Sequence, residues 1–487
     1  MGNASVRELQ PTRVWNNFAD LNAVPRPSKK EERVIQFMLD FGERHALETF
    51  KDQVGNVIIR KPATRGMTDR KMITLQSHLD MVHQKNNETI FDFDSQGIQM
   101  VVDGDWVRAK GTTLGADNGM GVAAIMALLE SSEIPHPALE ALFTIDEETG
   151  MTGAMGLEGG VLKGEILLNL DTEEDDELDI GCAGGIDVTA IGSYEETSMP
   201  ANMTVMELRV NGLKGGHSGI EIHKGLGNAN KIMNRLLYNA TAQFGIKILE
   251  INGGGLRNAI PRESSAVIGV TSTIRDDFKS ELKKWASAIA KELAGLEPGI
   301  DITAGPSDRN GKVMEVEAQE RLLKSIYAAH NGVYAMSAAI PGLVQTSNNI
   351  AKVAVKNGKI KIGCLTRSSV NSAKMDLANA LKATFELAGL EVALAGDYPG
   401  WTPDPNSEIL KILAYGYETL FHEKPKVAAC HAGLECGILG RNYPEMDMIS
   451  FGPTILGAHS PDERVQISSV QKFWKFLTAV LKEIPKK

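Results

Sequence analysis

Residues 72–80 read MITLQSHLD, an apolar run of strand length that passes directly into serine, histidine and aspartate. The pattern recurs in LEALFTIDEETG at 139–150 and in EILLNLDTEE at 165–174, where acidic residues follow the apolar run. Short apolar runs bounded by polar residues are typical of buried strands. Residues 118–131, NGMGVAAIMALLES, have helical character, so strands and helices alternate. This alternation predicts a largely parallel sheet covered by helices on both faces.

The polar residues at the ends of these strands are the first evidence of function. In open α/β sheets, ligands bind beyond the carboxyl ends of the parallel strands, which meet at one edge of the sheet. The side chains found there are histidines and acids, which bind metals or transfer protons. We therefore expect a site that includes His78, Asp80, Glu147, Glu148 and Asp171.

The middle of the chain has a different pattern from its two ends. Stretches such as TVMELRVNG and SSAVIGVTST alternate in polarity and are joined to helices such as FKSELKKWASAIAKELAGL, which is typical of an α+β domain with an antiparallel sheet. A chain of 487 residues suits two or three domains. We expect an α/β fold in which one domain, with a mixed, mostly parallel sheet, comprises residues 1–187 and 396–487. An α+β domain of residues 188–395 is inserted into it.

The composition excludes several classes of protein. Apolar residues make up 43% of the chain and charged residues 23%, as in a folded protein. The formal net charge is −11 and no block of Lys and Arg occurs, which argues against nucleic acid or anionic membrane partners. The four cysteines include no CxxC pair, so neither a zinc finger nor a thioredoxin-like site is indicated. No signal peptide or membrane span is visible, which predicts a soluble, cytoplasmic protein.

Five residues have the chemistry of metal ligands, and they are spread over the chain as His78, Asp117, Glu148, Asp171 and His459. Neutral imidazole and carboxylate form the mixed nitrogen and oxygen ligand set of Zn²⁺, Mn²⁺ or Co²⁺. The three carboxylates and one hydroxide supply a negative charge that two divalent ions neutralise and one ion does not. We therefore expect two ions, about 3.5–4 Å apart, bridged by one carboxylate and one water.

Two further acids, Asp80 and Glu147, lie next to these ligands in the sequence. Because residues two apart in an extended segment face the same side, Asp80 is placed to orient the imidazole of His78. Glu147 precedes Glu148, and adjacent residues at a strand end diverge, so one can bind metal while the other reaches a bridging water. A carboxylate beside such a water is suited to act as a general base and then to donate the proton to a leaving amine.

The ordered motifs are similar to those of a dinuclear metallopeptidase superfamily that includes carnosinases, aminoacylases and glutamate carboxypeptidases. Its pattern is HxD, a GxxDxKxG-like segment, a pair of glutamates, a later aspartate and a distal histidine. These stand here as SHLDMV, LGADNGMG, TIDEETGMTGA, NLDTEE and GAHSPDE. Longer blocks resemble the branch of bacterial aminoacyl-histidine dipeptidases nearly from end to end, among them LKGGHSGIEIHKGLGNANK, GGGLRNAIPRE and HAGLECG.

The resemblance implies how the expected ligands divide between two ions. His78 and Asp171 would bind one ion. Glu148 and His459 would bind the other, and Asp117 would bridge the two. The orienting aspartate and the general-base glutamate also have counterparts in the superfamily. Zn²⁺ is the metal that the resemblance favours, with Mn²⁺ or Co²⁺ as alternatives.

The inserted domain is implied to act as a lid and as the surface of a homodimer. His217 in GGHSG matches a histidine that approaches the scissile carbonyl, from its own chain or from a partner subunit, and would stabilise an oxyanion. Asn258 and Arg367 match positions that bind substrate, and the guanidinium fork of Arg367 suits a C-terminal carboxylate. Gly433 in HAGLECG matches a backbone position near the substrate.

The activity that the resemblance implies is hydrolysis of unblocked dipeptides, especially Xaa-His dipeptides such as carnosine (β-Ala-His). Two alternatives stay open. The same dinuclear site could serve an N-acyl-amino-acid deacylase, or the chain could be a metal-binding interaction protein without turnover. The intact Glu147 argues against the second alternative, because a site without turnover needs no general base.

Overall fold

The structure, a computed structural model, describes residues 3–487 and divides into two compact units. Unit 1 comprises the chain up to Gly181 together with Trp401–Ala429 and Leu434–Lys487. Unit 2 comprises Cys182–Gly400 and Cys430–Gly433. The chain therefore leaves unit 1 once for a long insertion, and it returns to unit 2 a second time for a short segment.

Unit 2 extends beyond the inserted domain of 188–395 that the sequence predicts. Strand β9 (Gly184–Ser193) pairs with β21 (Glu391–Tyr398), so the sheet of unit 2 takes in residues before and after that range. The segment Cys430–Gly433 joins the same unit, and the backbone N–H of Ala183 donates to two of its carbonyls at 2.9 Å. Neither extension has a signal in the hydrophobic pattern, since both depend on pairing between distant segments.

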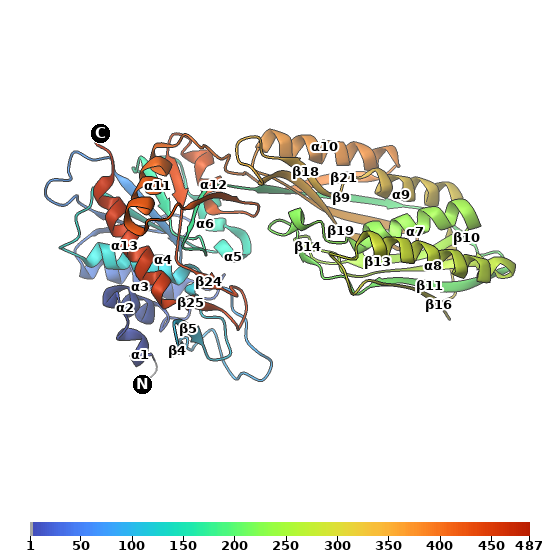
Figure 1. Ribbon diagram of the computed structural model, residues 1–487, viewed down its shortest axis with the longest axis horizontal. Helices are drawn as coiled ribbons and strands as arrows, with labels where there is room; N and C mark the ends of the chain where they lie inside the picture. Colours follow the sequence, from blue (N-terminus) through green and yellow to red (C-terminus); the bar gives the residue numbers. More distant parts are fainter. Residues whose placement is uncertain (1–2) are drawn as a thin grey trace. The chain divides into compact units, whose positions relative to one another are not determined.

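Unit 1 is built on an eight-stranded sheet (Figure 1). Its strands, in spatial order, are β1 (Glu48–Lys51), β2 (Val57–Lys61), β6 (Leu139–Thr144), β3 (Ile73–His78), β7 (Ile166–Asn169), β23 (Asp447–Ser450), β8 (Glu177–Cys182) and β22 (Lys426–Cys430). Strands β3, β6 and β7 are the three that the apolar runs predict, and every residue in them is buried. The prediction of these strands is therefore confirmed.

Parallel pairing joins the four central strands β6, β3, β7 and β23. The pairs β1–β2, β2–β6 and β8–β23 are antiparallel, so the sheet is mixed and less parallel than expected. A parallel connection needs a crossover of a dozen or more residues, whereas residues 52–56 between β1 and β2 suffice only for a hairpin. The central parallel strands still place the carboxyl ends of β3, β6 and β7 at one edge.

Helices pack on both faces of this sheet (Figure 1). The helices of unit 1 are α1 (Ala4–Arg7), α2 (Thr12–Leu21), α3 (Glu32–Arg44), α4 (Ala116–Glu130), α5 (Glu147–Gly150), α6 (Thr152–Gly156), α11 (Glu408–Phe421), α12 (Glu435–Asn442) and α13 (Ile467–Glu483). Helix α4 is the helix that the sequence predicts between the first two strands. It packs against β3 and α2 and is buried along nearly its whole length, because its residues are almost all apolar or small.

A second, four-stranded sheet in unit 1 has no counterpart in the sequence prediction. Its strands, in spatial order, are β24 (Ile455–Leu456), β25 (Arg464–Gln466), β5 (Trp106–Ala109) and β4 (Met100–Asp103). Strands of two to four residues carry too little periodicity to be recognised in a sequence. This sheet matters for the site because the loop with His459 connects β24 to β25 and is held by their antiparallel pairing.

Unit 2 is an α+β unit, as predicted, with a nine-stranded antiparallel sheet (Figure 1). The main path of the sheet runs β16 (Asp301–Pro306), β11 (Met203–Asn211), β15 (Ser264–Thr271), β13 (Lys247–Gly254), β19 (Val344–Lys356), β20 (Lys359–Ser368), β9 and β21, and β18 (Gly332–Met336) pairs with β19. Two short pairs add β10 (Glu196–Ser198) with β17 (Lys312–Met314), and β12 (Gly216–His217) with β14 (Ala259–Ile260).

Four helices and one large apolar core stabilise the sheet of unit 2. The helices are α7 (Ala229–Phe244), α8 (Arg275–Glu292), α9 (Val316–Ala328) and α10 (Asn371–Leu387). The core joins alternate residues of the strands to the apolar faces of the helices, as Val188, Leu236 and Phe385 do. Among residues 3–487, no helix has both the length and the apolar character that crossing a membrane requires.

Candidate metal centre

All five predicted metal ligands lie together in unit 1. His78 is the last residue of β3, Asp171 follows β7, and Glu148 lies in α5 directly after β6. Asp117 lies in the first turn of α4, and His459 lies in the loop between β24 and β25. The parallel strands explain three of these positions, because their carboxyl ends share one edge of the sheet.

Asp117 occupies the centre of this group. Its Oδ1 lies 3.1 Å from Nε2 of His78, and its Oδ2 lies 3.2 Å from Nε2 of His459. Nε2 of His78 also lies 3.5 Å from Oδ1 of Asp171, and Nε2 of His459 lies 2.9 Å from Oε2 of Glu148. The candidate ligand atoms thus form two triplets, each within 4.8 Å, that share Asp117.

The donor set fits a pair of divalent cations. The side chains of Glu148, Asp171 and Asp117 are 3%, 8% and 12% exposed, so three carboxylates lie in a region with little water. Oε1 of Glu148 is buried and has no hydrogen-bond partner among the described residues. Buried carboxylates with unsatisfied oxygens are unfavourable unless cations neutralise them. The residues therefore provide both the ligand atoms and the charge that such ions require.

The electrostatics of this group also favours cations. Hydrogen bonds to Asp117 and Glu148 raise the pKa of His459 to about 11. Burial raises the pKa of Asp171 to about 6, against the opposing effect of His78. Histidine ligands bind metal only when neutral, so bound protons compete with metal ions at these positions. Metal affinity is therefore expected to fall as the pH is lowered.

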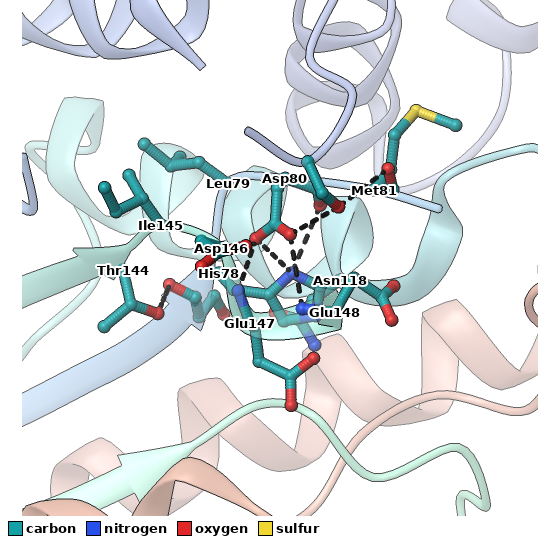
Figure 2. A network of polar contacts seen from close by, with 12 residues as sticks. His78, Leu79, Asp80, Met81, Asn118, Thr144, Ile145, Asp146, Glu147 and Glu148 are labelled. Carbon is teal, nitrogen blue, oxygen red and sulfur yellow. Dashed lines mark hydrogen bonds and ion pairs between the residues drawn. The ribbon is translucent and has the colours of Figure 1, made fainter. Parts of the chain in front are cut away.

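Asp80 connects His78 to the turn that carries the two glutamates. It is fully buried, and Nδ1 of His78 lies 3.1 Å from its carbonyl oxygen and 3.4 Å from its Oδ1. Its carboxylate accepts hydrogen bonds from the backbone N–H of Glu147 at 3.0 Å, the N–H of Glu148 at 3.3 Å and the hydroxyl of Ser28 at 2.8 Å (Figure 2). Asp80 therefore fixes the imidazole and the turn relative to each other, which supports the predicted orienting role.

Glu147 and Glu148 diverge as expected, but for a different reason. They lie in the helical turn α5, where successive side chains point about 100° apart, and not at the end of an extended strand. Figure 2 shows the two carboxylates leaving the backbone in different directions. Burial raises the pKa of Glu147 well above its ordinary value. A carboxylate with a raised pKa beside candidate metal ligands is suited to accept and return a proton.

One buried acid of this region was not singled out from the sequence. Glu435, the first residue of α12, is fully buried and its Oε2 accepts hydrogen bonds from Nε2 of Gln76 and Oγ1 of Thr144, both at 2.6 Å. Burial raises the pKa of Glu435 to about 8. It lies in the block HAGLECG, but an isolated glutamate has no pattern that marks it as buried, so the sequence does not predict its place beside the candidate ligands.

We expect the stability of the metal-free parent chain to fall as the pH rises from 5 to 8. In the E435Q variant this fall should be smaller. An acid whose pKa is raised on folding stays protonated in the folded state and ionises in the unfolded state, so stability falls as the pH rises from about 4.5 towards 8. Glutamine mimics the protonated acid and does not titrate. The pH-dependent loss of unfolding free energy should be on the order of 2 kcal/mol smaller in E435Q than in the parent chain. Urea unfolding at both pH values, with a chelator present, measures this loss. Equal pH dependence in the two proteins would contradict the raised pKa.

The predicted substrate residues all lie in unit 2. His217 ends β12, and its Nδ1 accepts hydrogen bonds from the backbone N–H of Gly219 at 3.2 Å and of Ile220 at 3.1 Å. These bonds place the proton of the neutral ring on Nε2, so His217 presents a hydrogen-bond donor. Asn258 is exposed, and its carbonyl accepts from the N–H of Ser218, which holds the two segments together.

Arg367 lies in β20 and is only 5% exposed. It donates to the hydroxyl of Tyr398 at 3.0 Å, while its Nε has no hydrogen-bond partner among the described residues. A Cβ built on Gly219 would lie 3.2 Å from that Nε and 3.1 Å from the ring of His217, so the two cationic or donor side chains lie against the same glycine. Gly433 is half-buried and belongs to the short segment that joins unit 2.

The chain is similar to known peptidases and dipeptidases. Residues 74–483 match the model of Peptidase family M20/M25/M40. The cytosol non-specific dipeptidase of Escherichia coli strain K12 is 42% identical over 484 residues, which cover 99% of this chain and 100% of that protein. The solved structure of aminoacylhistidine dipeptidase from Vibrio alginolyticus matches with a TM-score of 0.92 and 42% identity, covering 99% of this chain and 98% of that one.

A more distant structure shares the fold alone. Aminopeptidase PepT from Bacillus cereus matches with a TM-score of 0.58 and 15% identity, covering 98% of this chain and all of the other. The α/β fold with an inserted α+β unit, as predicted from the sequence, is thus confirmed, and so is the predicted family. The family model covers most of the chain and includes every predicted site residue. This protein belongs to Peptidase family M20/M25/M40.

Proposed function

We propose that this protein is a metal-dependent dipeptidase that hydrolyses unblocked dipeptides, with a preference for Xaa-His substrates such as carnosine. The observation that carries the proposal is the pair of ligand triplets that share Asp117, beside the half-buried carboxylate of Glu147. The names of the two relatives at 42% identity, a non-specific dipeptidase and an aminoacylhistidine dipeptidase, support the substrate class.

The proposed chemistry divides between the cations and the residues of unit 1. When bound, two divalent cations, most simply Zn²⁺ and otherwise Mn²⁺ or Co²⁺, would polarise the scissile carbonyl and lower the pKa of a shared water. Glu147 removes the proton from that water and later donates it to the departing amine. Asp80 holds His78 and the backbone of Glu147 in place through the hydrogen bonds described above.

Residues of unit 2 are proposed to bind the rest of the substrate. His217 donates from Nε2 to the oxygen that develops negative charge, since Nδ1 is already engaged as an acceptor. Arg367 holds the C-terminal carboxylate with its buried guanidinium. We assign Asn258 and the backbone of Gly433 to further contacts with the dipeptide, on the basis of the sequence resemblance.

The test of this function is a panel assay on metal-free protein reconstituted with Zn²⁺, Mn²⁺ or Co²⁺ in turn. Unblocked dipeptides, including carnosine, and N-acetyl amino acids are offered side by side, and released histidine or acetate is measured. Faster release from dipeptides supports the proposal, and faster release of acetate would indicate the deacylase alternative. Failure of every reconstituted form to cleave any substrate would indicate a metal-binding protein without turnover.

We expect R367K to raise KM for unblocked dipeptides at least about tenfold, with a smaller effect on kcat. Lysine keeps the charge but loses the two-pronged contact with a carboxylate. The matched control is R235K, because Arg235 forms a similar two-pronged pair with Glu292 on the surface of the same unit. KM for an amidated dipeptide should hardly differ between R367K and the parent chain. An unchanged KM for free dipeptides in R367K would reject the carboxylate assignment.

Two further parts of the proposal concern assembly and location. We propose a homodimer formed through unit 2, in which His217 serves either its own chain or the partner. Analytical ultracentrifugation would test the dimer, and mixing H217A with E147A protein would distinguish the two arrangements. Activity should return in the mixture only if His217 acts across subunits. The E. coli relative is named for the cytosol, and we propose the same compartment for this protein.

A further inference from the structure

Glu463 forms an unusual set of contacts next to the candidate metal centre. It is 2% exposed and lies four residues after His459, at the end of the same loop. Its Oε2 accepts hydrogen bonds from the backbone N–H of Leu114 at 2.6 Å and of Gly115 at 2.9 Å. Its Oε1 accepts from the N–H of Ala116 at 2.7 Å and of Asp117 at 3.3 Å. One carboxylate therefore binds four consecutive amides of the segment that carries Asp117.

A buried cation holds the same segment from its carbonyl side. Arg26 is 1% exposed and donates to the carbonyl of Gly115 at 2.6 Å. It also donates to the carbonyls of Leu79 at 3.0 Å and Asp80 at 3.1 Å, directly after His78. The guanidinium lies so close to this segment that only glycine fits at position 115, since a Cβ on Gly115 would lie 2.5 Å from Nη2 of Arg26. Glu463 and Arg26 thus bind opposite sides of one stretch of backbone.

These contacts connect three parts of the chain that carry candidate ligands. Arg26 connects the end of β3, with His78, to the start of α4. Glu463 connects the start of α4, with Asp117, to the loop of His459. The loop is also held by the two-residue pairing of β24 with β25, by hydrogen bonds within it such as that from the N–H of Glu463 to the carbonyl of Ser460, and by packing of Ala458 on an apolar cluster. Because Glu463 connects the loop directly to the backbone of Asp117, it helps to set the distance between the imidazole of His459 and the carboxylate of Asp117.

We propose that Glu463 is a positioning residue of the metal centre, which sets the affinity for the ion held between Asp117 and His459. This inference rests on the proposed metal binding and extends it to a residue outside the ligand set. The ionised carboxylate of Glu463 can accept hydrogen bonds from all four backbone N–H groups. A glutamine in its place would direct its own NH₂ group, which is a donor, at two of them. Residues that support ligands in this way typically change metal affinity or activity by 10–100-fold when they are replaced.

The test is the E463Q variant, with E297Q as its matched control. Glu297 is 1% exposed and also accepts from backbone amides, those of Lys214 at 2.7 Å and Gly227 at 2.9 Å, but it lies in unit 2. Metal affinity is measured by titration of Zn²⁺ into chelator-treated protein, and bound metal by elemental analysis. Circular dichroism and the thermal midpoint of the metal-free proteins report folding separately.

We expect E463Q to fold and to bind one of the two ions at least about tenfold more weakly, while E297Q keeps the affinities of the parent chain. Excess Zn²⁺ should restore activity of E463Q, with KM for dipeptides unchanged. A merely structural residue would lower the thermal midpoint of the metal-free protein and leave both affinities as they were. Parent-like affinity for both ions in folded E463Q, or an equal loss in E297Q, would overturn the proposal.

Two further outcomes are decisive. If E463Q fails to fold, E463D is measured instead, because it keeps the charge and shortens the reach, and unaltered affinity for both ions in that variant would overturn the proposal. If the parent chain binds two ions yet cleaves no substrate, the proposed dipeptidase function fails while the role of Glu463 is judged on metal affinity alone. A parent chain that binds none of Zn²⁺, Mn²⁺ and Co²⁺ would reject both.

Discussion

Replacing Glu147 with alanine is expected to lower kcat about 10²–10⁴-fold while the protein keeps two bound metal ions. Its carboxylate lies in the turn after β6, and its oxygen approaches within 4.8 Å of candidate ligand atoms of His78 and Glu148. Burial raises the pKa of Glu147, as suits a group that takes a proton and returns it. The variant removes proton transfer without removing a predicted ligand, so kcat should fall and metal content should not.

The measurement pairs steady-state kinetics on a dipeptide with elemental analysis of the same preparation. E147Q is the isosteric companion variant, because it keeps the volume of the side chain and abolishes its basicity. E158A is the matched control, since Glu158 is an exposed glutamate of the same unit without a role in the site. A kcat within a few-fold of the parent value in E147A with two bound ions would show that another group is the base.

Much of the fold could be predicted because hydrophobic patterning determines the central strands. Strands β3, β6 and β7 are fully buried and begin in largely apolar runs, and α4 consists almost entirely of apolar and small residues. The antiparallel edge strands and the sheet that contains β24 and β25 could not be predicted in the same way. Strands of two to four residues have no reliable period, and some of the pairings, such as that of β25 with β5, join segments far apart in the chain.

The residues of the candidate site could likewise be predicted only in part. The predicted ligands follow buried strands or lie in motifs with distinctive residue types, so their positions could be inferred before any geometry was available. Glu463, Arg26 and Glu435 carry equally strong contacts, but each binds groups that are remote in sequence. Glu463 and Arg26 bind chiefly backbone amides or carbonyls, which leave no trace in the identity of the residues that supply them. Only the folded backbone reveals that these charges are buried and what they hold.

The variant D117A is expected to retain fewer than two ions and to lose dipeptide hydrolysis almost completely. The two oxygens of Asp117 face Nε2 of His78 and Nε2 of His459, so this carboxylate is the one group common to both ligand triplets. If Asp117 bridges two ions as proposed, its removal would withdraw a ligand from each of them at once. Metal affinity should therefore fall by more than the 10–100-fold that follows loss of a supporting residue. Elemental analysis and Zn²⁺ titration would measure this loss.

The control for D117A must separate loss of metal from loss of folding. D447A serves this purpose, because Asp447 accepts from the hydroxyl of Ser407 at 2.7 Å and from the N–H of Ile409 at 3.0 Å at the start of α11. Removing that cap should cost about 1 kcal/mol of stability and leave both ions bound. D117A should instead lose bound metal while its metal-free form keeps a stability near that of the parent chain. Removing one of several acids that lie close together relieves repulsion between them. If D117A retained two ions, Asp117 would not bridge them and the division of ligands would have to be redrawn.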